Sequence, residues 1–179
     1  LSLAHDIIVM ADTLIYRKAE TEDLSVITDF VVGCIRYAFT RTLKLGPQEY
    51  YASDIFPVDY YGIRQKSLSN PTTLSSMAID PKTNQVVGYI EFGPKKPYFK
   101  DIDCQSEILC YFVSNQIQGK GVGKHLLGNI IQQALDNNTF SLGQDSVGIL
   151  TLKGNPSITT FYKRIGALPV QEHEWNVSL

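Results

Sequence analysis

Apolar residues follow two different periods along this chain, and the period separates expected strands from expected helices. Short apolar runs predict strands over residues 13–18, 74–79, 85–92, 107–113 and 147–152. Apolar positions that recur every three or four residues predict helices that begin near residues 21, 124 and 156. A turn cluster at 80–84 joins two of the strands into a hairpin. This irregular alternation predicts one α/β domain, of the α+β type, with a mixed sheet.

Residues at the ends of the expected helices support these boundaries. Thr21 is the expected N-cap of the first helix, and the acidic side chains at the next two positions suit the helix dipole. Asn155 is the expected N-cap of the last helix, and Pro156 occupies its first helical position. Gly166 is expected to end that helix as a C-terminal cap.

Composition and charge narrow the functional classes. The chain has 179 residues, of which 44% are hydrophobic and 19% charged, as is typical of a folded globular domain. Its formal charge of −2 argues against a protein that grips nucleic acid non-specifically. Three cysteines without a CxxC pair predict reduced thiols in the cytoplasm, and no apolar run approaches the length of a membrane span. Residues 1–10 are interpreted as an N-terminal appendage to a single domain over residues 11–179.

The strongest chemical signal is a glycine-rich loop between a buried strand and an amphipathic helix. It reads Gln118-Gly119-Lys120-Gly121-Val122-Gly123-Lys124. Glycine lets backbone N–H groups approach a ligand, and the helix N-terminus adds unpaired donors and a partial positive charge. Residues 108–135 contain no Asp or Glu, whereas the start of a helix usually carries an acid. The loop therefore predicts a site for a phosphate group supplied by a ligand.

Spacing disfavours the two commonest phosphate-binding motifs. A P-loop would need glycine at position 118 and Ser or Thr at 125, where this chain has Gln118 and His125. A dinucleotide fingerprint that starts at Gly119 would need a third glycine at position 124, which is Lys124. The pattern that fits is Gln/Arg-x-x-Gly-x-Gly/Ala. No metal is expected, because no obvious metal-binding acid accompanies the loop.

Three segments, in this order, resemble the GNAT family of acetyl-CoA-dependent N-acetyltransferases. They are the strand 107–113, the loop 118–123, and the segment 155–167, which looks like the family's Asn…Phe-Tyr-x-x-x-Gly-Ala/Phe signature. Each segment is a weak to moderate signal alone, and the three at these separations are specific. The resemblance implies a largely antiparallel central sheet that is flanked by helices and splayed at the cofactor-binding strands. It also implies acetyl transfer from acetyl-CoA to a primary amine.

The resemblance assigns the cofactor contacts residue by residue. The pyrophosphate of acetyl-CoA is expected on the backbone amides from Gln118 to Lys124. The pantetheine arm is expected to pair, like a short extra strand, with Tyr111, Phe112 and Val113. A backbone N–H near Tyr111 would hold the developing oxyanion. Asn155 is expected to contact the cofactor as well as to cap its helix.

Two residues are assigned to the chemistry. Tyr162 matches the family's general acid and would protonate the departing thiolate of coenzyme A, although its place on a buried helical stripe also suits a core tyrosine. Glu107, at the start of the central strand, is the candidate general base, and an ordered water is the alternative. His125 and His173 are weaker candidates. Cys110 is not expected to form an acyl-enzyme, because nothing adjacent in the sequence resembles an activating base.

The acceptor site is expected in a tyrosine-rich stretch between residues 49 and 61, where Pro57 breaks any helix. Aromatic faces and carboxylates there suit an ammonium group, and packing against the sheet explains them equally well. The candidate substrate residues are Tyr50, Tyr51, Tyr60 and Tyr61. The segment 155–167 also resembles that of polyamine acetyltransferases, so the expected acceptor is a small-molecule amine, like a polyamine or an amino acid.

Three other functional hypotheses remain open from the sequence. One is a protein or peptide amine as the acceptor, and another is a non-catalytic acyl-CoA-binding regulatory module. The third is an enzyme that binds ATP or GTP, which the failed P-loop spacing disfavours. Residues 167–179 predict one or two brief strands, and so short an end leaves the acceptor site either open or completed by a second subunit in a homodimer.

Overall fold

A computed structural model describes residues 13–42, 59–94, 104, 106–137, 147–149 and 156–168 of the chain. The chain divides into two compact units. The first comprises Leu1–Ile35 and Asp59–Ile149, and the second comprises Arg36–Val58 and Leu150–Leu179. All the strands named below belong to the first unit.

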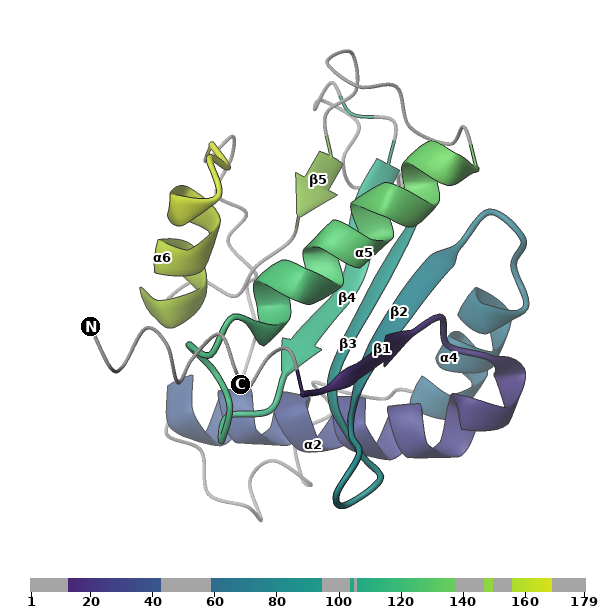
Figure 1. Cartoon of the computed structure of the whole chain (residues 1–179), viewed down its shortest axis with the longest axis horizontal. Helices are drawn as coiled ribbons and strands as arrows, with labels where there is room; N and C mark the ends of the chain where they lie inside the picture. Colours follow the sequence, from purple (N-terminus) through teal and green to yellow (C-terminus); the bar gives the residue numbers. More distant parts are fainter. Residues whose placement is uncertain are drawn as a thin grey trace, which may run out of the picture. The chain divides into compact units, whose positions relative to one another are not determined.

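Five strands form one sheet in the described part of the chain, in the order β1-β2-β3-β4-β5 (Figure 1). They are β1 (Ile15–Arg17), β2 (Leu74–Asp80), β3 (Gln85–Pro94), β4 (Ser106–Val113) and β5 (Val147–Ile149). Strands β1 to β4 pair antiparallel, and β5 joins β4 in parallel. The mixed, largely antiparallel sheet predicted from the sequence is confirmed.

The described helices are η1 (Thr21–Asp23), α2 (Leu24–Thr42), α4 (Tyr60–Leu68), α5 (Val122–Asp136) and α6 (Pro156–Arg164). The sequence predicts all of them except α4. Helix α4 escapes prediction because it has no apolar inward stripe, and its buried residue is the charged Arg64. Asp59 is its N-cap, with Oδ1 accepting a hydrogen bond from the Gly62 N–H at 2.8 Å.

Helix α5 covers one face of the sheet and crosses in front of the strands in Figure 1. Its buried stripe packs against apolar side chains of β2, β3 and β4; together these residues are Leu74, Ala78, Ile90, Phe92, Ile108, Val122, Leu126, Ile130 and Ala134. The helix approaches β3 closely at Gly88, where an added Cβ would lie 2.7 Å from Leu126 Cδ1. Glycine at this position therefore sets how closely α5 can lie on the sheet.

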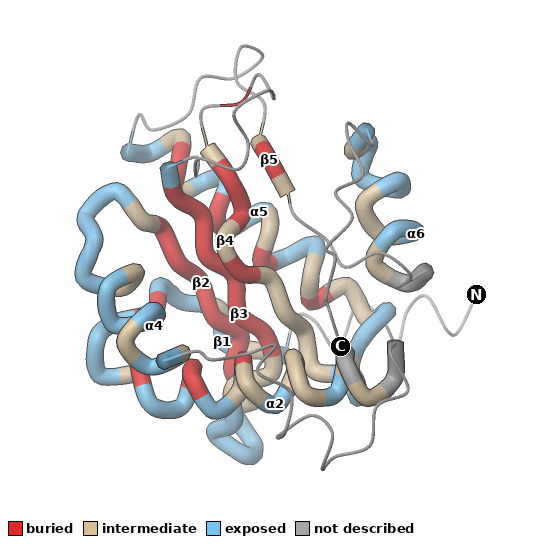
Figure 2. The backbone as a smooth tube through the Cα atoms, turned by 180° about the vertical axis from the view of Figure 1, so that it is seen from behind, coloured by how far each residue is buried: buried red, intermediate tan, exposed pale blue. Residues whose placement is uncertain are grey.

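The opposite face of the sheet packs against α2 and forms a second core. Ile27 and Val31 of α2 contribute to it, and so does Met77 of β2, whereas the neighbouring Ala78 belongs to the α5-side core. Figure 2 shows the buried backbone running along β2, β3 and β4. Because both faces are covered, consecutive residues of β2 and β3 are buried, rather than every second one.

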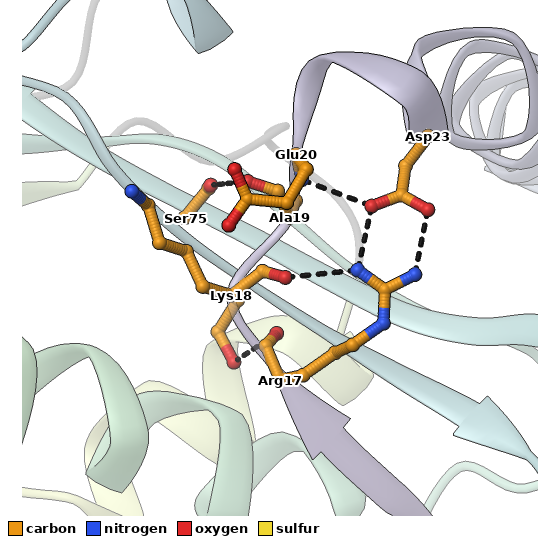
Figure 3. Close-up of polar contacts among 7 residues, drawn as sticks. Arg17, Lys18, Ala19, Glu20, Asp23 and Ser75 are labelled. Atoms are coloured by element: carbon orange, nitrogen blue, oxygen red, sulfur yellow. Dashed lines mark hydrogen bonds and ion pairs between the residues drawn. The ribbon is translucent and has the colours of Figure 1, made fainter.

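The turn from β1 into α2 is fixed by one acidic side chain (Figure 3). Asp23 Oδ2 accepts a hydrogen bond from the Glu20 N–H at 2.9 Å, and both carboxylate oxygens of Asp23 accept from the Arg17 guanidinium at 2.6 Å. The N-cap is Glu20, one residue before the predicted Thr21. The prediction of Thr21 is wrong because the carboxylate of Asp23 folds back onto the amide of Glu20, so that helical geometry begins at Thr21 itself.

Strand β4 contains a bulge where it pairs with β3. Cys110 lies opposite Glu91 and Ile108 lies opposite Phe92, so Leu109 is an extra residue on β4. Ile108 belongs to the α5-side core, whereas Cys110 belongs to the α2-side core. In an unbroken strand these two positions would share a face. The bulge therefore re-aims the second half of β4, which leads into the glycine-rich loop.

Helix α6 ends in the glycine cap that the sequence predicts. Gly166 has a φ of +87°, the Ala167 N–H donates to the Tyr162 carbonyl at 3.0 Å, and the Gly166 N–H donates to the Lys163 carbonyl at 3.1 Å. This pair of bonds is the Schellman arrangement. The predicted final strands fall mostly outside the described residues, and the described Ala167 and Leu168 are not in a strand.

Candidate functional site

The loop between β4 and α5 depends on glycine at two positions. Gly119 and Gly121 have φ angles of +80° and +85°, in the left-handed region. A side chain at either position costs about 1 kcal/mol or more. The Gln118 side-chain amide donates to the Val113 carbonyl at 3.0 Å and ties the loop to the end of β4. The backbone geometry therefore explains two of the glycines that the sequence singles out.

Helix α5 begins at this loop with no acidic residue in its first turn. Gly121 is the N-cap and offers no side chain to the first amide N–H groups. Lys120 is half-buried just before the helix, and Lys124 is exposed in its first turn. The helix amides and the two ammonium groups give this end of α5 a positive potential that suits phosphate oxygens.

Tyr111 ties β4 to the first turn of α5. Its hydroxyl donates a hydrogen bond to the Gly123 carbonyl at 2.5 Å. An added Cβ at Gly123 would lie 2.8 Å from the same hydroxyl. Gly123 therefore has a packing role that its place in the glycine motif does not reveal.

In the described part of the chain, β5 pairs with the first part of β4. The described part of β5 runs beside the first three residues of β4 and ends at Ile149, opposite Ile108. Residues 109–113 continue β4 past the described part of β5, and the bulge at Leu109 lies at the start of this stretch. The backbone of a sheet edge can pair with a further extended chain.

Glu107, the candidate base, is fully buried in β4. It lies opposite Gly93 of β3 and Gly148 of β5. Alternation with Ile108, which is in the α5-side core, places the Glu107 side chain on the α2 side of the sheet. The Glu107 carboxyl is therefore inside the protein, two residues before the bulge at Leu109.

The structure brings the predicted cofactor residues 111–113 and 118–124 together at the junction of β4 and α5. Tyr162 is half-buried on α6, which belongs to the second unit, and its ring meets Phe161 edge-on with centroids 5.3 Å apart. Tyr60 and Tyr61 begin α4, and Tyr61 is half exposed. Outside the described residues lie Tyr50, Tyr51, Asn155 and His173.

His125, a weaker base candidate, is exposed on α5. Its ring stacks on Tyr16 of β1, with centroids 5.4 Å apart and 22° between the planes. The stack connects the edge strand of the sheet to the first half of α5. It gives His125 a structural role in addition to any chemical one.

Sequence reasoning missed a buried charged network on the α2 side of the sheet. Arg64 Nη1 of α4 donates to Glu91 Oε2, and the Tyr89 hydroxyl donates to Glu91 Oε1 at 2.5 Å. Burial and then the Glu91 carboxylate raise the pKa of Tyr89, so its hydroxyl keeps its proton. The signal that could have found the network is Glu91 itself, because an acid inside a buried apolar strand needs a partner.

The described residues contain no cluster of metal-ligating side chains. Among them, no group of three or more His, Cys, Asp and Glu side chains could hold a metal ion. No helix in this part of the chain has the length and apolar character needed to cross a membrane. Cys34, Cys104 and Cys110 are free thiols, and burial raises the pKa of Cys34 to about 11.

Comparison with known families identifies the arrangement of loop, strand edge and helix. Residues 46–167 match the model of the acetyltransferase (GNAT) family. The chain belongs to the GNAT acetyltransferase family. The match covers α4, the β4–α5 junction and α6, so the family predicted from three short segments is confirmed.

Solved structures share the fold of this GNAT domain at low sequence identity. A predicted acetyltransferase with acetyl-CoA from Clostridium acetobutylicum is 18% identical, with a TM-score of 0.58. The aligned part covers 92% of this chain and 96% of that chain. An aminoglycoside acetyltransferase from an uncultured soil metagenomic sample, in complex with sisomicin, is 16% identical with a TM-score of 0.60, covering 94% and 97%. A ribosomal-protein-alanine N-acetyltransferase from Brucella melitensis biovar Abortus 2308 is 12% identical with a TM-score of 0.56, covering 90% and 97%. These similarities show the common fold.

Proposed function

We propose that this GNAT domain transfers an acetyl group from acetyl-CoA to a primary amine of a small molecule that resembles a polyamine or an amino acid. The observation that carries the proposal is the β4–α5 junction, where left-handed Gly119 and Gly121 lead into an acid-free helix start. Family membership supports acyl transfer. The neighbours named with acetyl-CoA and with sisomicin support this donor and a small-molecule amine.

Acetyl-CoA suits the junction through its phosphates and its pantetheine arm. The pyrophosphate accepts hydrogen bonds from the backbone of residues 118–124, and the ammonium groups of Lys120 and Lys124 add attraction. The pantetheine amides pair with residues 111–113 along the edge of β4. Asn155 is proposed as a further cofactor contact.

The reaction is a direct attack in a ternary complex. The amine nitrogen forms a bond to the thioester carbonyl carbon, and the carbon–sulfur bond breaks. A backbone N–H near Tyr111 stabilises the oxyanion, and Tyr162 gives a proton to the departing thiolate. An alkylammonium loses two protons on becoming an amide. One proton passes to Glu107 or to an ordered water. The other passes to solvent, and solvent returns a proton to Tyr162.

Calorimetric titration with acetyl-CoA, with ATP as the control, tests the cofactor. We expect acetyl-CoA to bind and ATP not to bind. The variant Gly119→Ala should bind acetyl-CoA about tenfold more weakly, because its left-handed φ of +80° strains any side chain. Gly33→Ala is the matched control, since neither glycine has an atom within 4 Å of an added Cβ and Gly33 lies in a helix. Absence of acetyl-CoA binding by the unaltered chain would overturn the proposal.

Thiol release in the presence of acetyl-CoA and a panel of amines then tests the acceptor. Diamines, amino acids and aminoglycosides are expected to act as acceptors. A higher kcat/KM with peptide N-termini would favour a protein or peptide acceptor instead, which the fold shared with the ribosomal-protein-alanine acetyltransferase makes the second candidate. Binding of acetyl-CoA with no thiol release for any amine would identify a non-catalytic module.

We further propose that residues 11–179 act as a single domain in the cytoplasm. A second copy of the chain is the candidate to complete the acceptor site in a homodimer. Sedimentation of the full chain with and without acetyl-CoA tests the second point, because a monomer at all concentrations would contradict it.

A further inference from the structure

Glu91 stands at the point of β3 that faces the bulge of β4. We propose that Arg64, Tyr89 and Glu91, called here the Glu91 network, form a positioning unit that fixes the register of β3 against β4 at the bulge and, through it, the rate of acetyl transfer. The effect on rate rests on the proposed function. The effect on register does not.

Both oxygens of the Glu91 carboxylate are engaged inside the protein. Oε2 accepts from Arg64 and Oε1 accepts from Tyr89, and the Glu91 and Tyr89 side chains have no exposed surface. Arg64 reaches them from α4 and is 8% exposed. Three side chains from two elements therefore meet at one position of β3, on the α2 side of the sheet.

The register of this strand pair needs such a device because an apolar core covers each face of the sheet. A slip of one residue sends every side chain of a strand to the other face, and a hydrophobic core on only one face would forbid it. Here the slipped strand would still bury apolar side chains on both faces. Glu91 breaks this symmetry, because its partners lie on the α2 side and the buried α5-side core contains apolar residues.

Stability alone does not account for the network. Within the described residues, Arg64 Nε and Ser67 Oγ of the same helix face are buried without a hydrogen-bond partner. An incompletely satisfied buried ion pair is often no more stable than a well-packed apolar pair of similar volume. Specifying a register is the best-attested use of such groups.

The bulge connects the network to the proposed transfer point. Glu91 pairs with Cys110, the residue that follows the extra Leu109. The bulge reverses which side chains of the following residues face α5. Tyr111 therefore lies on the α5 side of the sheet, where its hydroxyl donates to the Gly123 carbonyl. The bulge also decides which backbone N–H groups of residues 109–113 face the edge. A displacement of about 1 Å at a reacting centre can cost about 100-fold in rate.

The triple variant Arg64→Met, Tyr89→Phe and Glu91→Leu tests the inference, because it replaces the network by apolar side chains of similar volume and leaves no buried Tyr89 hydroxyl without its Glu91 acceptor. We expect a melting temperature equal to or above that of the unaltered chain, and an acetyl-CoA Kd that rises by a smaller factor than kcat falls. We expect kcat to fall about 10- to 100-fold and amide hydrogen exchange of residues 106–113 to accelerate at least tenfold relative to β2. Tyr89→Phe, which removes one hydrogen bond, should show a smaller change in the same direction.

The partly exposed ion pair of Arg17 and Asp23 provides the matched control. Arg17→Gln with Asp23→Asn should leave kcat and the exchange of residues 106–113 unchanged. A triple variant of Arg64, Tyr89 and Glu91 with unaltered kcat and unaltered exchange would overturn the inference while leaving the proposed function intact. An unaltered chain that binds acetyl-CoA and acetylates no amine would overturn the proposed function, and the exchange measurement would still decide the register.

Discussion

Glycines at the β4–α5 junction are required for different physical reasons. Gly119 and Gly121 adopt left-handed backbone angles, whereas Gly123 leaves room for the Tyr111 hydroxyl. Spacing in the sequence shows the three as one motif. The structure separates two residues that shape the loop from one that lets the helix start pack against β4.

Gly123→Ala should lower the free energy of unfolding by about 1–2 kcal/mol, because the new Cβ would displace the Tyr111 hydroxyl from its hydrogen bond. Gly128→Ala on the same helix is the control, since a Cβ there meets no atom within 4 Å. It should raise stability by up to about 1 kcal/mol through helix propensity. Urea unfolding of both variants checks the pair, and equal effects would contradict the packing role of Gly123.

Tyr162→Phe should keep acetyl-CoA affinity and lower kcat about 100-fold, since the phenol can no longer protonate the thiolate. Tyr37→Phe, at an exposed tyrosine of α2, is the control and should leave kcat unchanged. Steady-state rates of thiol release measure both variants. An unchanged rate for Tyr162→Phe would remove this residue from the mechanism.

Helix ends and strand pairings show how elements depend on single contacts between them. The Asp23 carboxylate joins η1 to β1 through Arg17, and α4 joins the sheet through Arg64. The first contact is partly exposed and the second is buried. They should therefore respond differently to substitution and to pH.

Asp23→Asn should destabilise the chain by about 1 kcal/mol at neutral pH. The hydrogen bond from Arg17 lowers the pKa of Asp23 below its ordinary value. The stabilising effect is therefore fully present above about pH 4, the pKa of an unfolded Asp, and is lost as the pH falls through the lower pKa of the folded state. Urea unfolding of the variant and the unaltered chain at pH 7 and pH 3 measures this difference. A difference that stays constant with pH would contradict the role of the charge.

Binding energy at one junction should stabilise the whole first unit, because the loop, β4 and α5 share its α5-side core. At 100 times its Kd, a ligand adds about 2.7 kcal/mol to the folded state. For a chain of this size, the melting temperature should rise by about 5–10 °C with acetyl-CoA. ATP at the same concentration is the control. A shift of equal size with ATP would show that the loop binds phosphate without regard to the rest of the cofactor.

Much of the fold could be predicted from local patterns. The apolar runs of β2, β3 and β4, the broad stripe of α5 and the Gly166 cap of α6 are all found where the sequence predicts them. Helix α4 could not be predicted, because a charged side chain, Arg64, takes the place of an apolar stripe. The N-cap at Glu20 was missed because the carboxylate that closes the turn comes three residues later.

The sequence by itself determined the family and the loop. The glycine spacing, the absence of an acid at the helix start and the signature of the last helix are local features, so they can be recognised without knowledge of the fold. Only the tertiary structure decided that Glu91 and Arg64 meet, 27 residues apart, and that Leu109 is an extra residue in β4. A bulge is a property of two paired strands, and a buried ion pair is a property of two packed elements. Neither can be recognised from the spacing of apolar residues in one segment, because each depends on the strand or helix that packs against that segment.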